Sequence, residues 1–194
     1  MKKYFLTIIL AFSLFAVKTY GYTLGNRNSA IKIVEFSDYQ CPYCRRFELN
    51  TFPYIYNNFI EKGYIEWQFK DYPLVNIHAF AYKAAEYADC SGKNYMLIRY
   101  YLYKYQNSWK DKGNIYAVLK LSGAPDLNKI KQCEKHNIPE RTIQKDMKEA
   151  DKLGISSTPS FAIYKNGRWL ETIHGYYDSG YWYATLTFLL TRSK

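Results

Sequence analysis

Short runs of branched and aromatic residues alternate along this chain with longer segments of helical periodicity. Residues 31–36 form a short run of branched apolar residues, which predicts a buried strand. Apolar residues recur near helical spacing from Pro42 onward, and Pro53 lies far enough inside the predicted helix to kink or divide it. Gly63 closes that helix, and residues 64–70 predict a second strand.

The second half of the chain changes pattern twice. Residues 77–153 carry few strand signals and several helical ones, so they predict a long helical insertion. Two strand-like runs, residues 160–164 and 169–173, then flank Asn166 and Gly167. Because an Asn-Gly pair supplies the positive φ of a tight hairpin, we expect these two strands to pair antiparallel. A last apolar-faced helix should pack against the sheet.

The N-terminus follows the pattern of an export signal. Two lysines precede an apolar run of fourteen residues, Tyr4 to Val17, which is typical of a secretory signal peptide. The run is shorter than the roughly 20 residues that a transmembrane helix needs. We therefore predict that residues 1–21 are a signal peptide cleaved after Gly21, with an uncleaved membrane anchor as the alternative.

Composition then bounds the exported part, residues 22–194. It contains no repeat, low-complexity tract or flexible linker, so a single unit is expected. We also expect a monomer. The formal net charge of +10 falls to +7 without the three lysines of the leader. Since the basic residues are scattered, with no arginine-rich arm or aromatic RNA-binding motif, nucleic acid is not an expected partner.

The candidate chemistry lies in Cys41 and Cys44, which follow the first predicted strand and open the first predicted helix. A Cys-x-x-Cys pair closes into a small disulfide ring, and a thiol at the first turn of a helix meets unpaired N–H groups that favour its thiolate. Half of a zinc site and a structural disulfide are the alternatives for such a pair. The export signal favours disulfide chemistry, because disulfides persist outside the cytosol.

A second motif, Thr158-Pro159, stands just before the predicted hairpin, and 114 residues separate Cys44 from Pro159. With Cys-Pro-Tyr-Cys, the acidic residue Glu35 six positions before Cys41, and the inserted helical block, this motif makes the chain resemble the DsbA family of thiol-disulfide oxidoreductases. The inserted block disfavours a plain glutaredoxin. The resemblance to the dimeric isomerases DsbC and DsbG fails, because 19 residues between Gly21 and Cys41 leave no room for their dimerisation domain.

The resemblance implies an α/β fold in which a thioredoxin fold is interrupted by a helical domain. We expect residues 22–76 and 154–194 to form the thioredoxin part and residues 77–153 the insertion. In this family Cys41 would be the exposed nucleophile and Cys44 the buried resolving thiol. No cofactor is implied.

Further residues are assigned by the same resemblance. Pro159 would be cis, which places the backbone of Thr158 beside Cys41, where it can pair with an extended client segment. Pro42 fixes φ at the first helical position, and Tyr43 replaces the histidine of the strongest oxidases, so a less oxidising potential is implied.

Glu35 matches a buried family carboxylate that helps move the proton of the buried thiol, and Lys70 on the neighbouring strand is its candidate partner. The alternative for this pair is an ordinary strand-end acid and a solvent-facing lysine.

Cys90 and Cys133 lie in the predicted insertion, 43 positions apart. They form a second disulfide, remain two buried thiols, or complete a zinc site with the first pair. Export favours the disulfide, and zinc is disfavoured because structural zinc sites usually gather two close pairs of ligands.

These observations predict an exported enzyme, periplasmic or otherwise extracytoplasmic, that introduces disulfides into unfolded exported proteins. A membrane partner like DsbB would reoxidise it. An exported reductase or isomerase is the nearest alternative, and a chaperone-like binding module with structural cysteines is a more distant one.

Overall fold

The computed structural model describes residues 22–191, so the predicted signal peptide and its cleavage site lie outside the described residues. The described residues contain a five-stranded sheet in the order β1-β3-β2-β4-β5. Its strands are β1 (Thr23–Gly25), β2 (Ile31–Ser37), β3 (Glu66–Asp71), β4 (Ser160–Lys165) and β5 (Arg168–His174). The central strand β2 pairs parallel with β3 and antiparallel with β4.

The helices of the described residues lie around this sheet. They are α1 (Pro42–Arg46), α2 (Phe52–Ile55), α3 (Ala81–Cys90), α4 (Tyr95–Lys104), α5 (Gln106–Trp109), α6 (Ile115–Leu121), α7 (Leu127–Lys135), α8 (Glu140–Lys152) and α9 (Ser179–Thr191), with π-helical segments η1 (Phe47–Thr51) and η2 (Tyr56–Ile60) and a short 3₁₀ helix, η3 (Gly92–Asn94). Pro53 divides the first predicted helix as expected, since α2 begins beside it after a π-helical turn.

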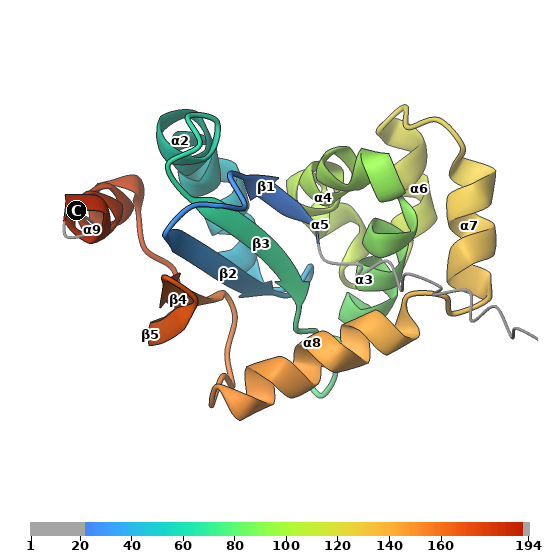
Figure 1. The fold of residues 1–194 in the computed structure, drawn as a ribbon. Helices are drawn as coiled ribbons and strands as arrows, with labels where there is room; N and C mark the ends of the chain where they lie inside the picture. The colour runs from blue at the N-terminus through green and yellow to red at the C-terminus, as the bar shows by residue number, and fades with distance from the viewer. Residues whose placement is uncertain (1–21, 192–194) are drawn as a thin grey trace, which may run out of the picture.

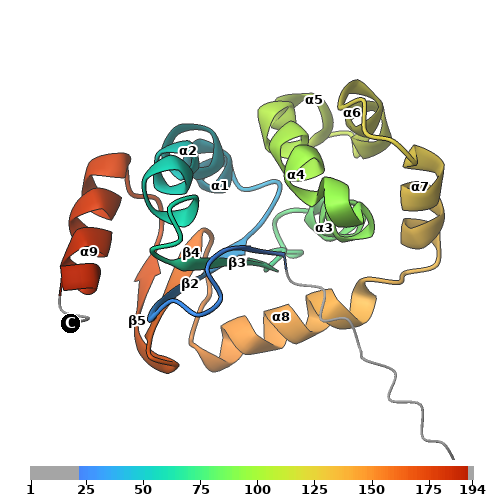
Figure 2. The ribbon, with the colours of Figure 1, turned by 45° about the horizontal axis from the view of Figure 1, so that its top comes forward.

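Alternation along the strands gives the sheet two different faces. Ile33 on β2 and Trp67 on β3 point to one face and join the large core, to which α1, α2 and α9 contribute. Val34 and Phe36 point to the other face and pack against Ala150 of α8. Figure 2 shows α8 running below the sheet, α1 and α2 above it, and helices α3 to α7 gathered at one end.

The predicted strands are all present, and the structure adds β1, whose three residues are too short to show a periodic pattern. Asn166 and Gly167 have φ values of 50° and 76°, so the β4–β5 hairpin turns where the Asn-Gly pair predicts. Within the described range, no helix combines the length and apolarity needed to span a membrane. In the chain order that the colours of Figure 1 follow, helices α3 to α8 come after β3 and before β4.

Candidate active site

The redox pair lies where β2 runs into α1. Cys41 caps α1 in an extended conformation, with φ −67° and ψ 123°, and Pro42 occupies the first turn, where its missing N–H would have had no partner in the helix. Cys41 is 5% exposed and Cys44 is 1% exposed. The expectation that Cys41 is an exposed nucleophile is therefore wrong for this state of the molecule, because the loop before β4 covers its sulfur, while Tyr43 points outward with 58% of its surface exposed.

The two thiols differ strongly in acidity. The pKa of Cys41 is lowered to about 6, first by a hydrogen bond with the Cys44 thiol and then, against the opposing effect of burial, by hydrogen bonds with Thr158 and the backbone N–H groups of Cys44 and Tyr43. Burial raises the pKa of Cys44 well above its ordinary value. Cys41 is consequently a thiolate near neutral pH, whereas Cys44 holds its proton.

The loop before β4 forms the other wall of the site. The Thr158–Pro159 peptide bond is cis. The backbone carbonyl of Thr158 lies 3.2 Å from Cys41 Sγ, although 117 positions separate the two residues. Thr158 and the redox pair therefore meet because β2 and β4 are neighbouring strands of the sheet.

Asp38 organises the turn before the redox pair, and the sequence analysis missed it. Its Oδ1 accepts hydrogen bonds from the backbone N–H groups of Gln40 at 2.7 Å and Cys41 at 3.2 Å. Its Oδ2 accepts from the N–H of Leu74 at 2.8 Å and lies 2.8 Å from Nδ1 of His78. An aspartate three residues before a helix N-cap, here Cys41, is a recognisable Asx-turn signal, so Asp38 was open to prediction.

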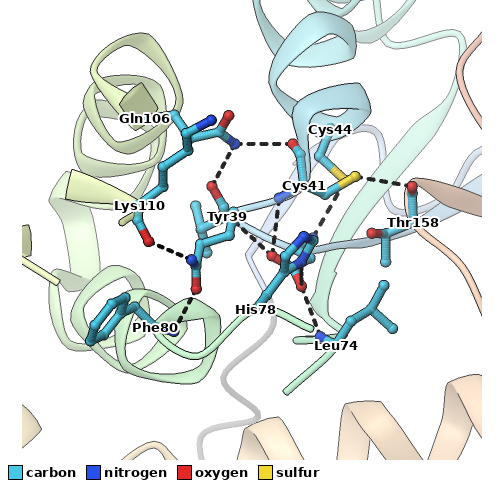
Figure 3. A network of polar contacts seen from close by, with 11 residues as sticks. Tyr39, Cys41, Cys44, Leu74, His78, Phe80, Gln106, Lys110 and Thr158 are labelled. Atoms are coloured by element: carbon cyan, nitrogen blue, oxygen red, sulfur yellow. Dashed lines mark hydrogen bonds and ion pairs between the residues drawn. The ribbon is translucent and has the colours of Figure 1, made fainter. Parts of the chain in front are cut away.

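Two glutamines join this turn to the helical insertion. Gln106 Nε2 on α5 donates to the carbonyls of Tyr39 and Cys41, at 2.8 and 3.0 Å. Gln40 Nε2 donates to the carbonyl of Lys110 at 2.7 Å. Figure 3 shows Gln106 and Thr158 reaching Cys41 from opposite sides. No local pattern around Gln106 points to this contact, because it depends on how the insertion folds back.

Glu35 is buried, as the resemblance implies, but its partners are not those expected. One carboxylate oxygen pairs with Arg99 on α4, and the other accepts from Trp67 Nε1 at 3.0 Å. Arg99 also donates to Glu48 at 2.8 Å and to Ser37 Oγ at 3.2 Å. Arg99 was missed because it stands in a helix of aromatic residues far along the chain.

Lys70 is not the partner of Glu35. In the parallel register of β2 and β3, Glu35 lies opposite Phe69 and Phe36 lies opposite Lys70. Since successive side chains alternate between faces, Lys70 points to the other side of the sheet from Glu35. There its Nζ binds Asp146 at 2.7 Å and Glu149 at 2.9 Å, which ties β3 to α8.

Cys90 at the end of α3 and Cys133 in α7 form a disulfide with a Cα–Cα distance of 5.7 Å. Both sulfur atoms are therefore committed to each other and cannot complete a zinc site with Cys41 and Cys44. The bond lies within the helical insertion and ties two of its helices together.

Comparisons with known proteins agree with this geometry. A family model described as Thioredoxin matches residues 18–176. The chain is 30% identical over 153 residues to the probable disulfide bond formation protein D of Bacillus cereus, an alignment that covers 75% of this chain and 69% of that protein.

Two crystal structures show the same fold. Wolbachia pipientis alpha-DsbA1 aligns with a TM-score of 0.78 at 23% identity, covering 89% of this chain and 92% of that one. Oxidised BdbD from Bacillus subtilis aligns with a TM-score of 0.74 at 20% identity, covering 89% and 94% of the two chains. The chain therefore belongs to the thioredoxin family, in its DsbA-like group of protein thiol-disulfide oxidoreductases.

Proposed function

We propose that this protein is an exported oxidase that introduces disulfides into secreted or periplasmic proteins through a Cys41–Cys44 disulfide. The observation that carries the proposal is the asymmetry of the pair, since Cys41 has a pKa of about 6 at a helix N-terminus while burial keeps Cys44 protonated. Such asymmetry assigns attack and release to one sulfur and resolution to the other.

The reaction divides into two exchanges. A client thiolate attacks Cys41 Sγ of the oxidised pair, a client–Cys41 bond forms, the Cys41–Cys44 bond breaks, and Cys44 leaves as a thiolate that takes up a proton. A second client thiolate then attacks the client sulfur of the mixed disulfide. The client gains a disulfide, and Cys41 leaves as the stabilised thiolate. The pair is then the free dithiol that the structure contains.

The same thiolate supports the proposed oxidising direction of exchange. Hydrogen bonds that favour the Cys41 thiolate stabilise the reduced enzyme and make its disulfide a stronger oxidant. Lowering a thiol pKa from 9.0 to about 6 stabilises the reduced state at pH 7 by roughly 1 kcal/mol, which corresponds to a few tens of millivolts for a two-electron couple.

The proposed oxidase acts in an oxidising compartment and needs a partner that reoxidises it. The predicted signal peptide supports export to an oxidising compartment, where client thiols await pairing. Each turnover leaves Cys41 and Cys44 reduced, so a second protein must accept two electrons. A membrane partner like DsbB fits that need. The exposed aromatic side chain of Tyr43 beside the pair supports contact with unfolded segments.

Oxidative refolding tests the proposal. The oxidised protein is mixed with a reduced, unfolded client that needs disulfides for activity, and client activity and free thiols are followed. We expect client oxidation by the wild-type protein and none by Cys41→Ser or Cys44→Ser, since neither variant can form the Cys41–Cys44 disulfide. Cys44→Ser loaded beforehand at Cys41 with oxidised glutathione should give a client–Cys41 mixed disulfide, because a client thiolate attacks Cys41 Sγ and glutathione leaves. The double variant Cys90→Ala/Cys133→Ala is the matched control and should retain exchange. Activity confined to scrambled, already oxidised clients would instead identify an isomerase.

A further inference from the structure

Gln106 links the helical insertion to the backbone carbonyl of Cys41, the residue that caps α1. Its side chain is 1% exposed. Both hydrogens of its amide group are used, one on the carbonyl of Tyr39 and one on that of Cys41. The same Cys41 carbonyl accepts the N–H of Arg45 at 3.1 Å, which is the first hydrogen bond of α1. Gln106 therefore holds the peptide plane at which α1 begins.

The first turn of α1 is also the source of the N–H groups that stabilise the Cys41 thiolate, those of Tyr43 and Cys44. Their direction depends on the orientation of the peptide that follows Cys41. A side chain that fixes this carbonyl consequently acts on the reacting sulfur without touching it.

Gln106 is itself firmly held. Trp109, three residues further along α5, is completely buried, and its Nε1 donates to the carbonyl of Leu102 at 2.9 Å. Gln40 makes a second bridge to the same insertion, since it accepts from the N–H of Phe80 and donates to the carbonyl of Lys110. Gln40 thus bonds the insertion through its side chain without binding the Cys41 carbonyl, which makes it a natural control.

We propose that Gln106 is a positioning residue of the redox site, which uses the rigid helical insertion to orient the first turn of α1 around Cys41 Sγ. The inference rests on the proposed function only in taking Cys41 as the reacting sulfur. It gives the insertion a part in the chemistry of the pair, in addition to any part in client contact.

The test compares Gln106→Met with Gln40→Met in the reduced protein. Each change keeps the approximate length and volume of the side chain and removes its hydrogen bonds to the other part of the molecule. The readouts are the thiolate absorbance at 240 nm against pH, with Cys41→Ser as the blank, and the equilibrium constant with glutathione.

We expect the thiolate midpoint of Gln106→Met to rise by about one pH unit, a tenfold change in the ionisation constant, and that of Gln40→Met to stay close to wild type. The Gln106→Met disulfide should become correspondingly less oxidising. Should Gln106→Met fail to fold, Gln106→Glu keeps the volume and replaces the donor by an acceptor, and its midpoint should rise in the same direction.

An unchanged midpoint in a folded Gln106 variant would overturn the inference, as would an equal rise in Gln40→Met. Failure of the proposed function can be told apart from failure of this inference. It would appear in the wild-type protein itself, as a Cys41 midpoint near 9 or as an absence of exchange. A merely structural role for Gln106 would lower the melting temperature without moving the midpoint.

Discussion

Charge and burial at single residues govern both the reactivity and the stability of this site. Cys41 and Cys44 are chemically identical thiols three positions apart, yet the first receives hydrogen bonds from the start of α1 and the second is enclosed by the core. Beneath them, Arg99 pairs with both Glu35 and Glu48, so in the described part of the chain two carboxylates face one guanidinium in this cluster. A proton on one carboxylate would balance the charge.

Glu48 is the carboxylate that we expect to hold this proton. Burial, opposed by Arg99 and reinforced by Glu35, raises the pKa of Glu48 to about 7. A carboxyl group whose pKa is higher in the folded state stabilises the fold below its unfolded pKa of 4.5, and this contribution is lost as the pH rises to about 7.

Glu48→Gln should therefore weaken the fall in stability between pH 5 and pH 8. We expect the difference in unfolding free energy between these pH values to shrink by roughly 1 to 3 kcal/mol relative to wild type, measured by urea denaturation. Glu140→Gln, which changes an exposed carboxylate, is the control and should keep the wild-type slope. An unchanged slope in Glu48→Gln would mean that Glu48 is ionised throughout this range.

The site residues that could be predicted from the sequence belong to local motifs, whereas those that could not be predicted have partners far away in the chain. Cys41, Pro42 and Cys44 carry their meaning within four positions, and Asp38 was recoverable from the turn that it begins. Arg99 and Gln106 have no such local context, because their partners are set by the docking of the insertion. Lys70 was misassigned because adjacency in the sheet was considered without the alternation of side chains between its faces.

At the scale of elements, the insertion is braced by the bond between α3 and α7. Cys90 and Cys133 close a loop of 43 residues, and cross-links of that length stabilise by about 4 kcal/mol in the chain-entropy model. The helices also cap the end of β3, where Asp146 and Glu149 of α8 bind Lys70. The disulfide thus joins α3 to α7, and the two ion pairs join α8 to β3.

Cys90→Ala/Cys133→Ala should lower the unfolding free energy by about 4 kcal/mol, because the unfolded chain regains the freedom that the cross-link removes. Chemical denaturation measures this loss, with the Cys41–Cys44 pair kept in the same redox state in both proteins. A loss below about 1 kcal/mol would show that the bond contributes little to folding. The folded double variant should still exchange disulfides, because the exchange reaction uses Cys41 and Cys44 and not the Cys90–Cys133 bond.

Periodicity predicted these elements better than it predicted their boundaries and their short companions. The Asn166-Gly167 turn and the strands on either side were specified by residues a few positions apart. The three-residue strand β1 was not, since it becomes a strand only by pairing with β3. The π-helical turns around Pro53 likewise depend on packing and have no periodic signal in the sequence.

At the scale of the whole molecule, the sheet assembles a site from distant parts of the chain. β2 delivers the redox pair, β4 delivers Thr158 and Pro159, and the insertion delivers Gln106. The fold class was predicted through the family resemblance, which Cys-Pro-Tyr-Cys, Thr158-Pro159 and the inserted helical block carry. The chemical direction of exchange did not, because it depends on a free-energy difference equal to a few hydrogen bonds.

The reduction potential of the Cys41–Cys44 pair tests the proposed oxidase most directly. The protein is equilibrated with defined ratios of reduced and oxidised glutathione at pH 7, and the fraction of free Cys41 is measured by alkylation and mass spectrometry. We predict a potential above about −200 mV, on the oxidising side of glutaredoxins. A potential below about −200 mV, in the range of glutaredoxin and thioredoxin, would contradict the oxidase and favour a reductase.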